Sequence, residues 1–119
     1  MRRITLLLTI VAGVLVLASG VALAANMVGN NGPNLLVGTQ QTDNIAGAAG
    51  NDTINALGGN DRAFGDSGAD ELNGGEGADF LNAADGAGGD VLHGGPGSDT
   101  CVRDVGDTII NCNAVTTVP

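Results

Sequence analysis

Apolar residues recur at a fixed interval of nine along most of the chain. From Gly29 to Asn82 the sequence divides into six segments of nine residues, and the eighth position of each is apolar. These positions are Leu36, Ile45, Ile54, Ala63, Leu72 and Leu81. A single apolar residue between polar neighbours suits a short strand, because alternate side chains of a strand face opposite sides. The pattern therefore predicts a stack of short strands around a narrow core.

An acidic column follows the same period. The sixth position of the six segments holds Asn34, Asp43, Asp52, Asp61, Asp70 and Asp79. Two extra residues then move the next acid to Asp90, the frame returns with Asp99, and a shortened last copy contributes Asp107. Two columns in constant phase indicate one repeated unit. They do not fit a glycine-rich linker, because a linker has no reason to keep apolar residues in phase.

Glycines precede most of these acids, as in "GGEGADFLN" at residues 74–82. We expect them to form tight turns with positive φ, in which glycine alone is unstrained. Such turns direct carbonyl oxygens toward one point. Calcium takes six to eight oxygen ligands in loose geometry, whereas magnesium demands a near-ideal octahedron and should compete poorly. The turns therefore predict sites for calcium.

The repeats resemble the repeats-in-toxin (RTX) family, also called haemolysin-type calcium-binding repeats, and the resemblance covers roughly residues 29–112. It implies an all-β fold, a right-handed parallel β-roll (β-solenoid) with two nonapeptides per coil. It also implies several Ca²⁺ ions, each between turns one coil apart, with each Asp using both oxygens to hold the ions on either side. The expected pairs include Asp43 with Asp61, Asp70 with Asp90, and Asp90 with Asp107. The expected metal ligands are Asp43, Asp52, Asp61, Asp70, Asp79, Asp90, Asp99 and Asp107.

The first residues read differently from the repeats. Arg2 and Arg3 precede an uncharged stretch from Ile4 to Ala25, with small residues at Ala22 and Ala24. This is typical of a helical signal peptide cleaved near Ala24 or Ala25, and it favours a secreted protein. A retained membrane anchor is the alternative, since about 20 apolar residues can span a bilayer. We therefore expect a signal peptide at 1–25, a linker and N-terminal cap at 26–34, the calcium-binding roll at 35–112 and a tail at 113–119.

Charge and cysteine content narrow the class further. Without the leader, Arg62 and Arg103 face 13 acidic residues, a net charge of −11. Such a surface repels nucleic acid and anionic lipid and attracts cations. Cys101 and Cys112 are the two cysteines, and an even count in an exported chain predicts a disulfide rather than a catalytic or metal role. This disulfide would hold the last coil in place.

The remaining polar residues carry no catalytic pattern. His93 has no nucleophile or second histidine at a motif spacing and is expected at the surface. The acids outside the sixth column are expected to be solvated surface charges: Asp66, Glu71, Glu76, Asp85 and Asp104. We predict a small secreted calcium-binding protein that folds on binding calcium, a structural or interaction module and no enzyme. The alternatives are a calcium-stabilised surface adhesin module, with an unidentified protein or glycan partner, or the remnant C-terminal tail of a secreted hydrolase.

Overall fold

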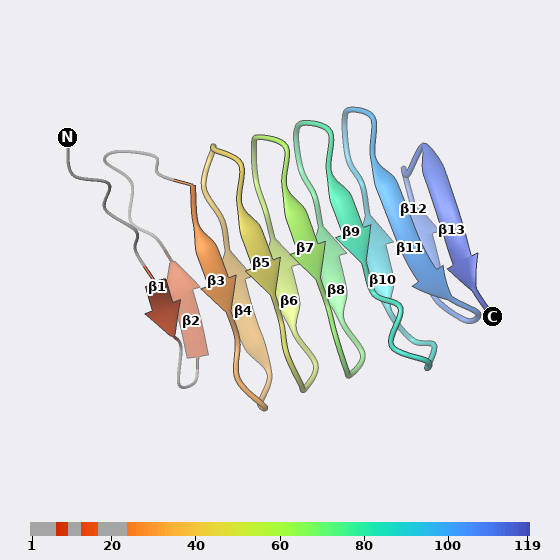
Figure 1. The fold of residues 1–119 in the computed structure, drawn as a ribbon, viewed down its shortest axis with the longest axis horizontal. Helices are drawn as coiled ribbons and strands as arrows, with labels where there is room; N and C mark the ends of the chain where they lie inside the picture. The colour runs from red at the N-terminus through yellow and green to blue at the C-terminus, as the bar shows by residue number, and fades with distance from the viewer. Residues whose placement is uncertain (1–6, 10–12, 17–23) are drawn as a thin grey trace.

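The computed structural model describes residues 7–9, 13–16 and 24–119, and in this part of the chain all regular structure is β-strand. The odd-numbered strands form one sheet: β1 (Leu7–Thr9), β3 (Asn26–Val28), β5 (Asn44–Ala46), β7 (Arg62–Phe64), β9 (Phe80–Asn82), β11 (Thr100–Asp104) and β13 (Ala114–Val118). The even-numbered strands form the other: β2 (Gly13–Val16), β4 (Asn34–Val37), β6 (Thr53–Asn55), β8 (Glu71–Asn73), β10 (Val91–His93) and β12 (Thr108–Ile110). The chain alternates between the sheets, and Figure 1 shows the resulting flattened spiral. The predicted parallel β-roll with two nonapeptides per coil is confirmed.

The register keeps equivalent repeat positions in line. Every neighbouring pair of strands is parallel, and Leu36 lies opposite Ile54, which lies opposite Leu72. The central side chain of β3 and of β5 to β10 points inward, so that Ile54 and Leu72 are fully buried while Glu71 is exposed. One inward residue per strand makes a core only one side chain wide on each sheet. Such a core buries little apolar surface for the number of residues ordered.

The two-residue insertion is absorbed in the loop between β9 and β10, at the lower right of Figure 1. The strands on either side keep their register, since Val91 still pairs with Glu71. The carboxylate of Asp104 caps this loop, where its Oδ2 accepts the N–H groups of Asp85 at 2.7 Å and Gly86 at 2.8 Å. Asp104 is therefore buried, and its expected role as a solvated surface charge is wrong. Asp104 comes three residues after Cys101, and its side chain reaches the loop because successive coils stack on one another.

Strand pairing extends beyond the expected limits of the roll at both ends. β3 lies in the segment expected to be a linker and cap, and β13 lies in the expected tail and pairs with β11 over five residues. The expected signal helix falls largely on residues 1–6, 10–12 and 17–23, outside the described part; the described pieces between them, β1 and β2, are strands. The described residues contain no helix long and apolar enough to cross a bilayer.

Candidate metal centres

The acidic column forms two rows, one along each edge of the roll, where the chain turns from one sheet to the other. We call first edge the turns that lead from even to odd strands, at the top of Figure 1, and second edge the opposite turns. The first edge carries Asp43, Asp61, Asp79 and Asp99, and the second carries Asp52, Asp70, Asp90 and Asp107. All eight predicted site residues are at most 5% exposed. The structure thus brings them together as two buried ladders.

Hydrogen bonds link successive rungs of each ladder. The N–H of Asp61 donates to Oδ1 of Asp79 at 2.9 Å, and the N–H of Asp52 donates to Oδ1 of Asp70 at 2.8 Å. The same bond joins Asp43 to Asp61, Asp70 to Asp90, Asp79 to Asp99, and Asp90 to Asp107. All the pairs expected from the family resemblance are therefore neighbours, including the pairs that span the insertion. One oxygen of each carboxylate is engaged in holding adjacent coils together.

The second oxygen, Oδ2, has no hydrogen-bond donor in most of these carboxylates. Within the described residues, Oδ2 accepts no hydrogen bond although it is buried in six carboxylates: Asp52, Asp61, Asp70, Asp79, Asp90 and Asp99. A buried, unpaired carboxylate oxygen is costly, because it has lost its water and gained nothing in return. A cation beside each oxygen removes that cost.

At two of these carboxylates, a main-chain oxygen of the next coil approaches the same glycine as the free oxygen. A Cβ atom placed on Gly47 would be 2.5 Å from Asp52 Oδ2 and 2.8 Å from the carbonyl oxygen of Gly65. At Gly74 the corresponding distances are 2.5 Å to Asp79 Oδ2 and 2.7 Å to the carbonyl oxygen of Gly94. A carboxylate oxygen and a carbonyl oxygen of the next coil therefore both lie against the backbone of each glycine, where a side chain would displace them. Hard oxygen donors of these two kinds suit calcium.

These first-column glycines correct our account of the turn. We expected positive φ to explain the glycines, and that holds for the fourth column except Gly32, with φ of 130° at Gly68 and 124° at Gly77. Gly47 and Gly74 do not have positive φ. They are required because the carboxylate and the next coil approach their backbone so closely. The sequence showed the glycine column, but it could not show which constraint applied at each position.

Two members of the acidic column differ from the other six. Oδ2 of Asp43 accepts the N–H of Thr39 at 2.6 Å, and its Oδ1 accepts the N–H of Ala25 at 2.7 Å. Both oxygens of Asp107 are also engaged, with Oδ2 accepting the N–H of Asp104 at 2.7 Å. At these two positions protein donors already satisfy the carboxylate. The geometry therefore favours the six residues with a free oxygen as metal ligands.

One residue of the ladders was not predicted from the sequence. Oδ1 of Asn113 accepts the N–H of Asp99 at 2.8 Å, which is the bond that an Asp makes elsewhere in the ladder. Asn113 continues the first edge past its last acid, as a neutral residue. The signal was present in the sequence, since Asn34 occupies the sixth column at the other end. It was hidden because the last repeat is shortened.

Burial dominates the electrostatics of the ladders. Loss of hydration raises the pKa of Asp61 and Asp70 to about 7 and the pKa of Asp79 and Asp90 to about 6. It also raises the pKa of Asp52. The hydrogen bond from the preceding rung lowers each pKa in part, and repulsion between neighbouring carboxylates raises it again. Without a cation, the folded roll therefore binds protons more tightly than the unfolded chain does.

Calcium binding is accordingly expected to release protons and to weaken on acidification. Protons compete for these carboxylates, whose pKa in the metal-free folded roll is about 6 to 7, so the folded roll should bind calcium less tightly at pH 5 than at pH 8. The metal-free roll should change in the opposite direction: raised pKa values mean that the folded state binds protons more tightly than the unfolded chain, so its stability rises as pH falls toward 4. Calorimetric titrations across this range test both. An affinity independent of pH would contradict the raised pKa values.

The described residues contain no group of three or more His, Cys, Asp or Glu side chains arranged to hold a metal. An ion in the ladders therefore takes main-chain oxygens as well as carboxylates.

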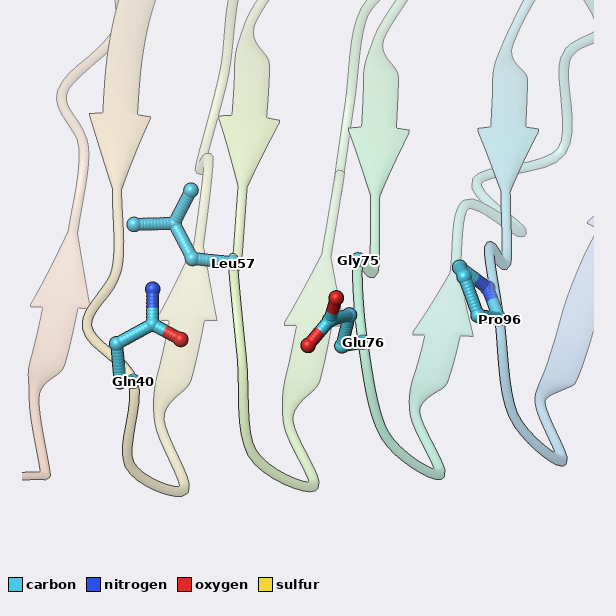
Figure 2. Close-up of a pocket in the computed structure, with 5 residues that line it drawn as sticks. All are labelled: Gln40, Leu57, Gly75, Glu76 and Pro96. Atoms are coloured by element: carbon cyan, nitrogen blue, oxygen red, sulfur yellow. The ribbon is translucent and has the colours of Figure 1, made fainter.

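Figure 2 shows a groove beside the first edge, lined by Gln40, Leu57, Gly75, Glu76 and Pro96 from four successive turns of that edge. Its residues include one carboxylate and no nucleophile with an adjacent base, so the groove offers no catalytic arrangement.

Comparison with known proteins identifies the repeats. A family model described as "RTX calcium-binding nonapeptide repeat (4 copies)" matches residues 28–63, 57–88 and 82–110. The matches cover both edges and all the carboxylates with a free oxygen. No curated protein and no solved structure matches the chain.

Proposed function

Because the chain belongs to the RTX calcium-binding nonapeptide-repeat family, whose repeats bind several Ca²⁺ ions per array, we propose that it is a secreted calcium-binding module that folds on binding calcium and carries out no catalysis. The observation that supports this most directly is the set of six buried Asp Oδ2 atoms without donors among the described residues. Each lies on an edge where the next coil passes closely, and calcium is the cation that such oxygens bind best.

The same six aspartates would hold the ions, together with carbonyl oxygens such as those of Gly65 and Gly94. Bound calcium supplies positive charge between carboxylates that otherwise repel one another. The chain's own contribution is to place one carboxylate oxygen in a hydrogen bond to the preceding coil and to leave the other free. Asp43 and Asp107, whose oxygens are satisfied by protein donors, would act mainly as structural rungs.

Folding and binding are coupled in this proposal. The ladders stack carboxylates at the spacing of neighbouring strands, about 4.8 Å, and the glycines add a large entropy cost on folding. The core is one side chain wide on each sheet, which is too little to offset both terms. Calcium bound only by the folded roll adds its binding free energy to the stability of the fold.

Export is part of the same proposal. RTX repeats are typical of extracellular proteins, and the disulfide between Cys101 and Cys112 fits an oxidising compartment. Residues 1–25 would act as the signal peptide, and cleavage near Ala24 or Ala25 would leave β3 and β4 as the first coil. The intact mass of the protein recovered from the medium tests this, and a mass that includes residues 1–24 would refute cleavage.

Replacing Asp70 by Asn tests the assignment of the sites. Asp70→Asn keeps an acceptor for the N–H of Asp52 but removes the charge from the free oxygen. We expect calcium affinity at the affected site to fall by about tenfold or more, because ligand charge sets calcium affinity over orders of magnitude. Calorimetric titration with calcium measures the change.

Asp66→Asn is the matched control. Asp66 lies on the same turn, but it is exposed, and its Oδ2 accepts only a long hydrogen bond of 3.3 Å from the N–H of Ala48. It should leave the titration nearly unchanged. Equal effects of the two substitutions would mean that overall charge, and not the ladder, determines binding.

A further inference from the structure

The first edge ends without a complete nonapeptide turn. Its last full turn is residues 94–99, which lead from β10 to β11 and end in Asp99. When the chain next reaches this edge, only residues 111–113 separate β12 from β13. A turn of three residues has replaced a turn of six, and it contains Cys112 and no acid.

This short turn nevertheless presents the same oxygens as a full one. Its side-chain acceptor is Asn113 Oδ1, which takes the N–H of Asp99 at 2.8 Å, as Asp99 Oδ1 takes the N–H of Asp79 at 2.9 Å. Its main-chain oxygen is the carbonyl of Asn111, which approaches the point where a Cβ on Gly94 would lie. Asp99 Oδ2 lies 2.6 Å from that same point. The arrangement repeats that of Asp79 Oδ2 and the carbonyl of Gly94 around Gly74, one coil earlier.

Asp99 Oδ2 is also one of the buried oxygens with no donor among the described residues, and Asp99 is 1% exposed. A buried carboxylate oxygen without a donor, close to the same glycine as a carbonyl oxygen, favours a bound cation. This last site lies outside the regular array, because half of it comes from a segment that is not a nonapeptide.

The disulfide anchors that segment. Cys112 sits between Asn111 and Asn113, and it is bonded to Cys101, which is fully buried in the apolar column two residues after Asp99. In the earlier turns of this edge, the apolar residue two positions after the acid packs in the core, as Ile45, Ala63 and Leu81 do, and these contacts hold the turn. Here the bridge takes the place of those contacts and ties both oxygen-bearing residues to the core.

We infer that the Cys101–Cys112 disulfide completes a terminal calcium site, formed by Asp99 Oδ2 and the carbonyl oxygen of Asn111 with Asn113 orienting Asp99. This rests on the calcium binding proposed above and deepens it: the last ion binds only to the oxidised chain. The cap of the roll therefore forms after export, when the bridge has been made, and a reduced chain lacks one ion. The chemical ligand is a divalent cation with a preference for oxygen donors.

Native mass spectrometry in calcium, which counts bound ions, tests the inference with the oxidised protein and a Cys101→Ala/Cys112→Ala variant. The variant is expected to bind one ion fewer. Asp99→Asn should remove one ion from the oxidised protein and none from the cysteine variant, because both changes destroy the same site. Asp70→Asn, on the opposite edge, should lower the count equally in both backgrounds.

Equal ion counts in the oxidised protein and the cysteine variant would overturn the terminal site while leaving calcium binding intact. A cysteine variant that folds but binds no ion would overturn it too, because the bridge would then support the whole array. An oxidised protein that binds no ion would instead overturn the proposed function. If the cysteine variant does not fold, calcium binding by Asn113→Ala in the oxidised protein tests the inference instead.

Asn113→Ala removes the acceptor for the N–H of Asp99 and should weaken the terminal site by about tenfold or more, as loss of a residue that orients a ligand does. Asn113→Asp keeps the acceptor and should retain the ion. Unchanged binding in Asn113→Ala would contradict the inference.

Discussion

Removal of calcium is expected to convert the roll into a largely disordered chain. The six buried Oδ2 atoms would then have neither a donor nor a cation, and the one-residue-wide core cannot offset that cost together with the entropy cost of the glycines. Far-ultraviolet circular dichroism should lose its β signal in excess chelator and regain it when calcium is restored. Limited proteolysis should change from resistance to rapid cleavage under the same conditions.

Two controls separate this effect from others. Magnesium added in place of calcium should restore little structure, because its strict octahedral geometry does not suit carbonyls and shared carboxylates. The disulfide stays closed in chelator, so the loss cannot be attributed to reduction. A protein that is equally compact and protease-resistant in chelator would refute the coupling of folding to metal.

The second large effect is expected from Gly74→Ala. A Cβ at this position would lie 2.5 Å from Asp79 Oδ2 and 2.7 Å from the carbonyl oxygen of Gly94, so it would push both oxygens from their places. We expect loss of one calcium ion and a fall of about 1–3 kcal/mol in the free energy of unfolding at fixed calcium, the usual cost of inserting a methyl group into a packed site. Chemical denaturation in calcium and native mass spectrometry measure the two effects.

Gly32→Ala is the matched control for this substitution. Gly32 has no positive φ, and the nearest atom to an added Cβ is Oδ1 of Asn30 at 3.4 Å, ordinary contact distance. It should leave both stability and ion count nearly unchanged. If Gly74→Ala behaves like Gly32→Ala, the close approach seen around Gly74 does not form the metal site.

Many features of the fold and the site were predictable because the apolar residues and the acids recur at the same interval of nine. A period of nine with one inward residue determines which residue of each strand enters the core, and Ile54 and Leu72 do so. The same period places every acid of the sixth column on an edge, next to the acid one coil away. The disulfide could be predicted from cysteine count alone. None of these inferences needs contacts between distant residues.

Other features depend on contacts that have no local signature. Asp104 resembles a surface charge in the sequence, yet the stacking of coils places it under the inserted loop, where it accepts two N–H groups. Asp43 and Asp107 also belong to the acidic column, yet both of their oxygens are taken by protein donors. Whether a carboxylate oxygen is free depends on which N–H groups the neighbouring coils bring to it.

The sequence by itself determined the inward residue of each strand and the equivalence of the acids, because a strict repeat forces equivalent residues into equivalent places; the coil of two repeats and its two acidic ladders followed from the family resemblance. Only the tertiary structure decided which oxygens remain unpaired, that Gly47 and Gly74 serve close approach rather than positive φ, and that Asn113 forms the last rung. The physical reason is that hydrogen-bond donors and carbonyl oxygens reach each carboxylate from neighbouring coils. Their positions are set by stacking, which a single repeat does not encode.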